Sequence, residues 1–395
     1  MLAILIGGWL IYAVVLPPLE IRHKIATTRW KYSRTDPEIS ISIRFMLRTC
    51  EYWFMFWFLY LGASIGSFIN VVASRTPRGK TIVTRGSHCP FCDSPLNLID
   101  NSPVFGWLLL RGRCRRCHLP IAPRYVWMEV ALGLIFMALA GIELFSNGYN
   151  LPHRDWKFGA GIVQTVFYPK WDLIGAYVAH CSLFSIALML IASQMDRLRF
   201  PALPLAVFVA LYAVAVSCNR VLCPVRWYEP FGSPQPYVGA PWFDQTITAA
   251  LGGIVGACLG SALAILLARF LFAKSSAPSI APDADAAGNG DDFSARIDGE
   301  HDMPSVATSS AWRWHYTILC CLAGTLLGWQ AIAVIALVSA TITLLGLAVM
   351  RFQPRMRDAA GTFLSAPVIA LAVWTITLFL HHVGWRQIAH WLHIG

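Results

Sequence analysis

The clearest pattern along the chain is a series of long apolar runs separated by shorter polar segments. A helix needs about 20 mostly apolar residues to cross roughly 30 Å of hydrocarbon, and eight stretches approach or exceed that length. They are residues 1–17, 53–74, 125–146, 172–195, 202–217, 246–273, 314–349 and 362–382. Because a backbone in lipid must satisfy its own hydrogen bonds, the pattern predicts an all-α, polytopic helical membrane protein with about 8 spans.

Composition agrees with this class and removes one alternative. The chain is 56% hydrophobic and only 13% charged. Its formal net charge of +10 would suggest a nucleic-acid partner in a soluble domain. The Lys and Arg residues lie mostly in short loops, however, so the positive-inside pattern of membrane proteins explains them. We therefore expect a lipid bilayer as the surrounding partner and no nucleic acid.

The polar segments divide the chain into six parts. The run 1–17 has no basic residues before it and no small-residue cleavage site after it, which favours an anchor over a removed signal peptide. Residues 274–312 hold seven acids between Asp283 and Asp302 and are predicted to be disordered. The predicted parts are an N-terminal anchor and basic loop (1–52), a span (53–74), a cysteine-bearing domain (75–124), a membrane bundle (125–273), the acidic loop (274–312), and C-terminal helices and tail (313–395).

The basic residues also predict an orientation. Thiols that bind metal favour a reducing compartment, which places the cysteine-bearing loop on the cytoplasmic face. Arg197, Lys274 and Arg351 then fall on that same face, as the positive-inside rule requires. If the runs 1–17 and 53–74 both cross the membrane, the basic loop 18–52 lies on the non-cytoplasmic face, against the positive-inside rule. The orientation of the N-terminal run therefore stays open.

Four cysteines form the most specific local motif. Cys89 and Cys92 make one Cys-x-x-Cys pair, and Cys114 and Cys117 make a second pair after 21 intervening residues. Two such pairs are typical of a closed tetrahedral zinc site, because each pair forms a tight turn that directs two thiolates at one ion. Two disulfides, or a chance arrangement among 11 cysteines, are the alternatives.

Acidic residues near the spans are the candidates for chemistry, because charges in membranes are costly and usually functional. Asp196 stands out, since it follows an apolar run and precedes Arg197. A structural alternative is a helix-end carboxylate paired with a neighbouring arginine. Glu129 and Asp244 are the next candidates, although the predicted topology puts Asp244 on the opposite face from Asp196.

Several motifs resemble the type IV prepilin peptidase family. The resemblance covers most of the chain from about residue 60 and is most specific around the cysteines. It rests on Gly66-Ser67-Phe68-Ile69-Asn70-Val71-Val72, Asn101-Ser102-Pro103-Val104-Phe105-Gly106-Trp107-Leu108, Arg111-Gly112-Arg113-Cys114, Ile121-Ala122-Pro123-Arg124-Tyr125, Glu129, Leu327-Gly328-Trp329-Gln330 and Gly361-Thr362-Phe363-Leu364.

This resemblance implies an integral-membrane aspartic endopeptidase. Such enzymes remove the short basic leader of type IV pilin and type II secretion pseudopilin precursors at the cytoplasmic face of the inner membrane. Many members also methylate the new N-terminus with S-adenosylmethionine, and the cysteine loop is their structural zinc-binding domain. Cleavage uses two aspartates: one, ionised, takes a proton from water, and its protonated partner polarises the scissile carbonyl.

The resemblance assigns the first aspartate to Asp196 and leaves the second without a match. Counting back from Gln330, the second position falls on Tyr316, where no Gly-x-Gly-Asp motif is present. Two hypotheses follow: a prepilin peptidase that depends on Asp196, or a catalytically inactive family member that acts as a membrane scaffold or pilin-binding protein. An unrelated transporter is disfavoured, because the spans show neither repeats nor a charged pathway.

Overall fold

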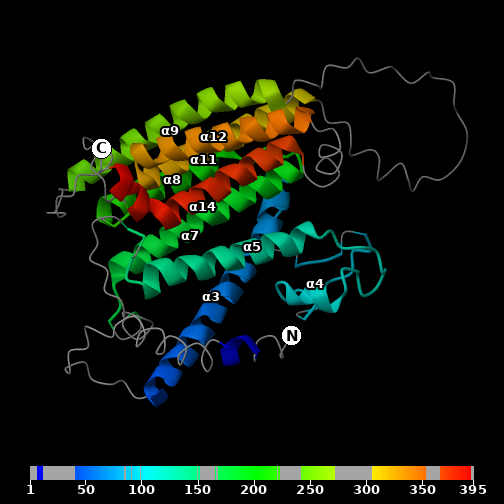
Figure 1. Ribbon diagram of the computed structural model, residues 1–395. Helices are drawn as coiled ribbons and strands as arrows, with labels where there is room; N and C mark the ends of the chain where they lie inside the picture. Colours follow the sequence, from blue (N-terminus) through cyan, green and yellow to red (C-terminus); the bar gives the residue numbers. More distant parts are fainter. Residues whose placement is uncertain are drawn as a thin grey trace, which may run out of the picture. The chain divides into compact units, whose positions relative to one another are not determined.

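The computed structural model describes residues 7–11, 41–83, 86–89, 91–97, 99–148, 150–151, 165, 168–219, 221–222, 242–271, 305–352 and 365–392. Within these ranges the regular structure is helical and contains no strand, which confirms the all-α prediction (Figure 1). The elements are α3 (Ile41–Arg75), η2 (Thr76–Arg78), α4 (Phe105–Leu109), α5 (Arg124–Leu139), η3 (Ala140–Phe145), α7 (Trp171–Met195), α8 (Ala202–Cys218), α9 (Trp242–Leu271), α11 (Ser305–Leu327), α12 (Trp329–Phe352) and α14 (Ala366–Leu392).

Six helices in the described part of the chain are long and apolar enough to cross a membrane. They lie at Phe45–Arg78, Arg124–Phe145, Trp171–Met195, Trp242–Leu271, Trp329–Val349 and Ala366–Gly384. The run predicted at 202–217 forms the shorter apolar helix α8, which has 17 residues. Many apolar side chains on these helices are exposed, Trp57 and Ile254 among them, as expected for surfaces that face lipid.

Some predictions concern residues outside the described ranges. Most of the anchor and basic loop (1–52) and most of the acidic loop (274–312) fall there, as does the motif Gly361-Thr362-Phe363-Leu364. The predictions for these segments stay predictions.

The chain divides into two compact units. The first unit comprises Met1–Phe68 and Gly86–Cys181, and the second comprises Ile69–Arg85 and Ser182–Gly395.

In the first unit, glycines bring α3 and α5 into close contact. A Cβ atom added to Gly62 would lie 2.7 Å from the Leu132 carbonyl oxygen, and one added to Gly66 would lie 2.9 Å from the Glu129 Cα. Such distances are too short for any side chain, so the helices can pack this closely only because these positions are glycine. Small residues at such positions are typical of closely packed membrane helices.

In the second unit, α9 and α11 pack backbone to backbone. Gly252 and Gly324 face each other, and a Cβ on either would overlap the other's carbonyl group. The helices α9, α11, α12 and α14 lie side by side in Figure 1, with α8 against α9 and α11. Trp312, Tyr316 and Trp374 fill the interior and are almost fully buried.

The run 314–349 forms two helices that reverse direction at Gly328. Helix α11 ends at Leu327 and α12 begins at Trp329. Gly328 has a φ of 90°, a conformation that glycine adopts without steric cost and other residues rarely adopt. The glycine therefore makes the reversal possible within a single residue.

Candidate functional site

The four predicted metal-binding cysteines come together in the first unit. The sulfur atoms of Cys89, Cys92, Cys114 and Cys117 all lie within 4.8 Å of one another. The Cys89–Cys117 Sγ distance is 3.7 Å and the Cys92–Cys114 distance is 4.0 Å. Four thiolates at about 2.3 Å from one zinc ion would be about 3.8 Å apart. The spacing therefore fits a tetrahedral metal site, and all four thiols are free rather than paired in disulfides.

The two cysteine pairs have the same backbone geometry. In the first pair, the Cys89 N–H donates to the Ser94 carbonyl at 2.9 Å and the Asp93 N–H donates to the Cys89 carbonyl at 3.0 Å. The second pair repeats both bonds with Cys114, Leu119 and His118, at 2.9 and 3.0 Å. Asp93 and His118 occupy equivalent places and have φ values of 54° and 58°. The local repeat explains how two short sequences direct their sulfurs at one point.

The turns also make the thiols better metal ligands. The backbone N–H groups of Cys117 and Arg116 point at the Cys114 sulfur and lower the pKa of that thiol to about 6. At Cys117 the hydrogen bond from the Leu119 N–H lowers the thiol pKa. Burial and the neighbouring thiols outweigh this bond and raise the pKa of Cys117 to about 12. Four thiolates so close together repel one another, so full deprotonation of the cluster requires a bound cation.

Two contacts hold the segment between the cysteine pairs. Arg115 forms a two-pronged ion pair with Asp100, with N–O distances of 2.6 and 3.1 Å. The Val104 N–H donates to the Glu129 carboxylate at 2.6 Å, although Val104 has a φ of 62°, which is strained for a β-branched residue. Glu129 on α5 is thus a structural acceptor that ties the cysteine-bearing loop to its following helix.

Asp196 lies in the second unit, at the C-terminal cap of α7. The Leu198 N–H donates to the Ser193 carbonyl at 2.9 Å and the Arg197 N–H donates to the Gln194 carbonyl at 3.0 Å. Arg197 has a φ of 56°. This bonding and backbone define a Schellman cap, whose left-handed position is usually a glycine.

The Asp196 carboxylate is mostly buried and lies near an arginine. Its Oδ2 lies 3.8 Å from Nη1 of Arg78, and only 11% of its side-chain surface is exposed. A carboxylate at a helix C-terminus faces the negative end of the helix dipole, which disfavours it. Arg78, in the segment after α3, is one arginine that offsets this charge. The predicted pairing of Asp196 with an arginine is therefore present and includes a residue distant in the chain.

Tyr316, at the position that the resemblance gives to the second aspartate, contacts α12 and its own helix. Its hydroxyl lies 3.5 Å from the Ser339 hydroxyl on α12, and its ring packs on Trp312. The side chain of its neighbour His315 instead contacts Gln194 and Phe200 on either side of Asp196. The other predicted candidate, Asp244, lies in the first turn of α9.

Sequence reasoning missed a buried pair in the first unit. Glu143 Oε1 lies 2.9 Å from Nδ1 of His180, and both side chains are almost completely buried. Glu143 belongs to η3, a π-helical turn, and such turns frequently occur at functional sites. An acid inside the apolar run 125–146 was a signal for Glu143, but nothing in the sequence indicated His180 as its partner.

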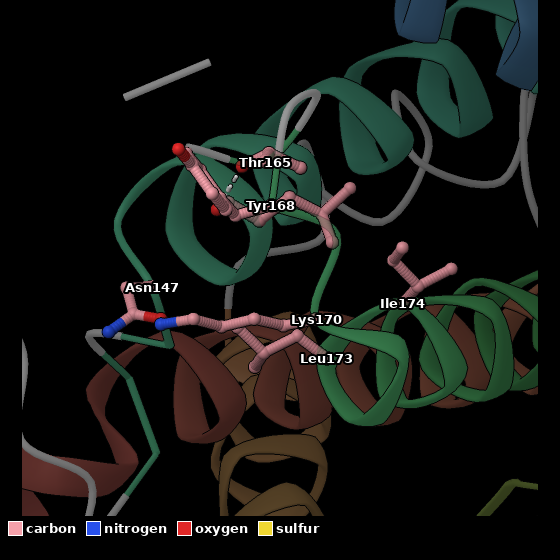
Figure 2. Close-up of a pocket in the computed structure, with 7 residues that line it drawn as sticks. Asn147, Thr165, Tyr168, Lys170, Leu173 and Ile174 are labelled. Carbon is pink, nitrogen blue, oxygen red and sulfur yellow. Dashed lines mark hydrogen bonds between the residues drawn. The ribbon is translucent and has the colours of Figure 1, made fainter. Parts of the chain in front are cut away.

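A small pocket lies near the start of α7 in the same unit (Figure 2). Inside it the Lys170 ammonium donates to the Asn147 side-chain oxygen at 2.5 Å, and the Thr165 hydroxyl donates to the Leu144 carbonyl at 2.9 Å. Figure 2 shows Lys170 extended toward Asn147. The lining contains none of the predicted site residues, so the pocket is separate from the predicted chemistry.

Comparisons with known proteins match the cysteine-bearing part of the chain. Residues 60–142 match the family model described as Bacterial Peptidase A24 N-terminal domain. The prepilin leader peptidase/N-methyltransferase of Myxococcus xanthus is 46% identical over 78 residues, which are 20% of this chain and 23% of that protein. The protein of the same name from Klebsiella pneumoniae is 45% identical over 91 residues, which are 21% of this chain and 40% of that protein.

A third relative extends the match. The type 4 prepilin-like proteins leader peptide-processing enzyme of Escherichia coli is 34% identical over 124 residues, covering 26% of this chain and 46% of that protein. The chain thus spans less than half the length of each of these relatives. No solved structure matches.

The fold and the cysteine cluster together define a multi-pass helical membrane protein with a loop whose four cysteines could hold a metal ion. The matched segment, which contains all four cysteines and Glu129, is similar to the bacterial peptidase A24 N-terminal domain and to part of the prepilin leader peptidases. The family model ends before Asp196.

Proposed function

We propose that the protein is a prepilin peptidase-like aspartic endopeptidase of the inner membrane. It cleaves the leader peptides of type IV pilin or pseudopilin precursors at the cytoplasmic face and methylates the new N-terminus with S-adenosylmethionine. The observation that carries the proposal is the similarity of residues 60–142 to prepilin leader peptidases, together with a cysteine cluster whose spacing suits one metal ion.

Asp196 is the proposed general base. As a carboxylate at the end of α7, held 3.8 Å from the Arg78 guanidinium, it accepts a proton from the attacking water. The second acid of a dyad would donate a hydrogen bond to the scissile carbonyl, and a positioned acid of this kind contributes on the order of 10²- to 10⁴-fold in rate. Since Tyr316 is turned toward Ser339, Asp196 acts without a carboxylate from that position, and cleavage is correspondingly slow.

Zinc is the proposed metal of the cysteine cluster. Cys89, Cys92, Cys114 and Cys117 would hold the ion with no ligand position left open, which is the arrangement of structural zinc sites. When bound, zinc would neutralise the thiolates and lock the two turns together. The cysteine-bearing domain, proposed at residues 75–124, faces the cytoplasm in this scheme.

Purified protein incubated with a pilin-like precursor tests the proposal. The parent should release the leader, whereas Asp196→Asn, which keeps the shape and removes the base, should lower the initial rate by at least roughly 100-fold. Asp244→Asn, in the first turn of α9, serves as the matched control and should cleave at the parental rate. Equal rates in the parent and Asp196→Asn would remove Asp196 from the mechanism.

The two halves of the proposed activity are separable in the same assay. Radiolabelled S-adenosylmethionine should transfer its methyl group to the N-terminal amine that cleavage exposes. Labelled product that appears only after leader release supports both steps. A parent protein that binds the precursor but neither cleaves nor methylates it would establish the scaffold alternative instead.

A further inference from the structure

Two adjacent residues of α11 bind the backbone of Phe200, just beyond Asp196. Trp314 Nε1 donates to the Phe200 carbonyl oxygen at 3.1 Å. The Phe200 N–H donates to His315 Nε2, also at 3.1 Å. His315 is fully buried and Phe200 is 2% exposed. Both backbone polar groups of one residue are therefore fixed by a single helix.

The other nitrogen of His315 reaches the residues before Asp196. Because Nε2 accepts from a backbone N–H, the proton of the neutral ring is on Nδ1. Nδ1 lies 3.1 Å from Gln194 Oε1 and donates to it. Gln194 is 1% exposed. One imidazole thus bridges a residue two positions before Asp196 and a residue four positions after it.

Two more contacts fix the same turn within the second unit. The Arg199 guanidinium lies over the Trp314 ring, 5.0 Å from its centroid, in a cation–π arrangement. The Ser193 hydroxyl donates to the Ala73 carbonyl at 3.2 Å. The turn is therefore held at both ends, although Arg197 within it has a left-handed backbone conformation.

We propose that Trp314 and His315 are positioning residues that hold the Asp196 turn in the geometry required for proton transfer. Neither side chain needs to touch the substrate, because each acts through the backbone or side chains that flank Asp196. The inference rests on the proposed function only in taking Asp196 as the base. We call the contacts of Trp314 with Phe200, and of His315 with Phe200 and Gln194, the clamp. The clamp has consequences that are measurable without any substrate.

Trypsin provides the substrate-independent test, because the turn contains two exposed cleavage sites, Arg197 and Arg199. Full-length protein in detergent is digested, and cuts after these residues are quantified by mass spectrometry. Removing a buried hydrogen bond makes local opening easier, so His315→Leu and Trp314→Phe should each be cut roughly tenfold faster or more. His315→Gln, which keeps one donor and one acceptor, should restore much of the resistance.

Trp312→Phe is the matched control. Its indole also donates to a backbone carbonyl at 3.1 Å from α11, but to Pro367 rather than to the Asp196 turn. This variant should lose general stability without faster cleavage at Arg197 or Arg199. Equal acceleration in Trp312→Phe and Trp314→Phe, or no acceleration in His315→Leu, would overturn the clamp.

Cleavage kinetics test the link to Asp196. In Trp314→Phe and His315→Leu, kcat for the precursor should fall at least roughly tenfold while KM stays within about twofold, and His315→Gln should recover part of kcat. Faster trypsin cleavage with parental kcat would overturn the positioning role. If the parent cleaves no precursor, the proposed function fails, and the trypsin comparison alone still decides whether the clamp exists.

Discussion

At the scale of single residues, Asp196 occupies a place where helix stability alone would not put a carboxylate. The residue caps α7 beside Arg78, and the next residue, Arg197, has a φ of 56°. Both features cost free energy: the helix dipole disfavours the charge, and a side chain disfavours the left-handed backbone. Arrangements that sacrifice stability are common at functional positions, which agrees with the proposed role of Asp196.

Arg197→Gly should stabilise the protein. Glycine adopts the left-handed conformation without steric cost, so the free energy of unfolding should rise by about 0.5–1 kcal/mol. Thermal unfolding in detergent measures the change. Arg199→Gly is the comparison: it removes the contact with Trp314 without relieving a left-handed residue, and it should lower the midpoint. An unfolding midpoint for Arg197→Gly below that of the parent would contradict the inference that the backbone at Arg197 is strained.

Replacing Tyr316 by aspartate should not restore an aspartate dyad. The side chain at this position is 1% exposed and faces Ser339, so Tyr316→Asp would bury a carboxyl in the packed interior. We expect the free energy of unfolding to fall by about 3 kcal/mol or more, with no gain in precursor cleavage. Tyr316→Phe, which loses only the hydroxyl, should cost about 1 kcal/mol. Faster cleavage by Tyr316→Asp would show that this position reaches the active site.

At the scale of elements, the apolar runs predicted most helices and both borders of the cysteine-bearing loop. The loop was predicted at 75–124, and the structure has α3 ending at Arg75 and α5 beginning at Arg124. The start of α3 was predicted too late, at residue 53 instead of Ile41, because the helix continues through polar residues that apolarity alone excludes.

Side-chain direction could not be predicted from a run of residues. The phase of α11 turns His315 toward Gln194 and Tyr316 toward Ser339. That phase depends on which faces of α11 pack on other helices, and tertiary packing determines those faces. For the same reason the sequence did not indicate the pairing of Glu143 with His180.

The contact between α9 and α11 should tolerate no side chain at its glycines. A Cβ at Gly256 would overlap the Cys320 carbonyl, so Gly256→Val should force the helices apart and destabilise the protein by about 1–3 kcal/mol. A Cβ added to Gly346, in α12, would meet no neighbouring atom within 4 Å, and Gly346→Ala is the control. Equal unfolding midpoints for the two variants would contradict the close packing.

At the scale of the whole molecule, the metal site should be stoichiometric and sensitive to acid. The parent should carry one zinc ion per chain by atomic emission, and Cys114→Ser should carry none, whereas Cys258→Ser in α9 should retain it. Protons compete with zinc for thiolates. Because the Cys114 pKa is about 6, protonation of this thiol, and with it zinc transfer to a chelator, should increase as the pH falls through and below about 6.

A chelation rate that does not change with pH would contradict binding by these thiolates. Full zinc content in Cys114→Ser would contradict the four-cysteine site.

Across the whole molecule, local motifs could be predicted from the sequence, whereas contacts between distant segments could not. The clustering of the four cysteines was predicted from their local spacing, which folding preserves because each turn makes its own hydrogen bonds. The similarity of the matched segment to prepilin peptidases was predicted from the resemblance of its motifs. Arg78 contacts Asp196, and His315 of α11 contacts the nearby Gln194. Contacts between segments so distant in the chain leave no local pattern.

Intact-mass measurement of a pilin-like precursor tests the proposed role of Asp196 in leader cleavage. The precursor is measured before and after incubation with the parent and with Asp196→Asn at equal concentrations. With the parent we expect a single loss of mass equal to the leader peptide, followed by a gain of one methyl group, and with Asp196→Asn we expect an unchanged mass. An unchanged precursor in the parent reaction, or the same leader loss in both reactions, would overturn the proposed role.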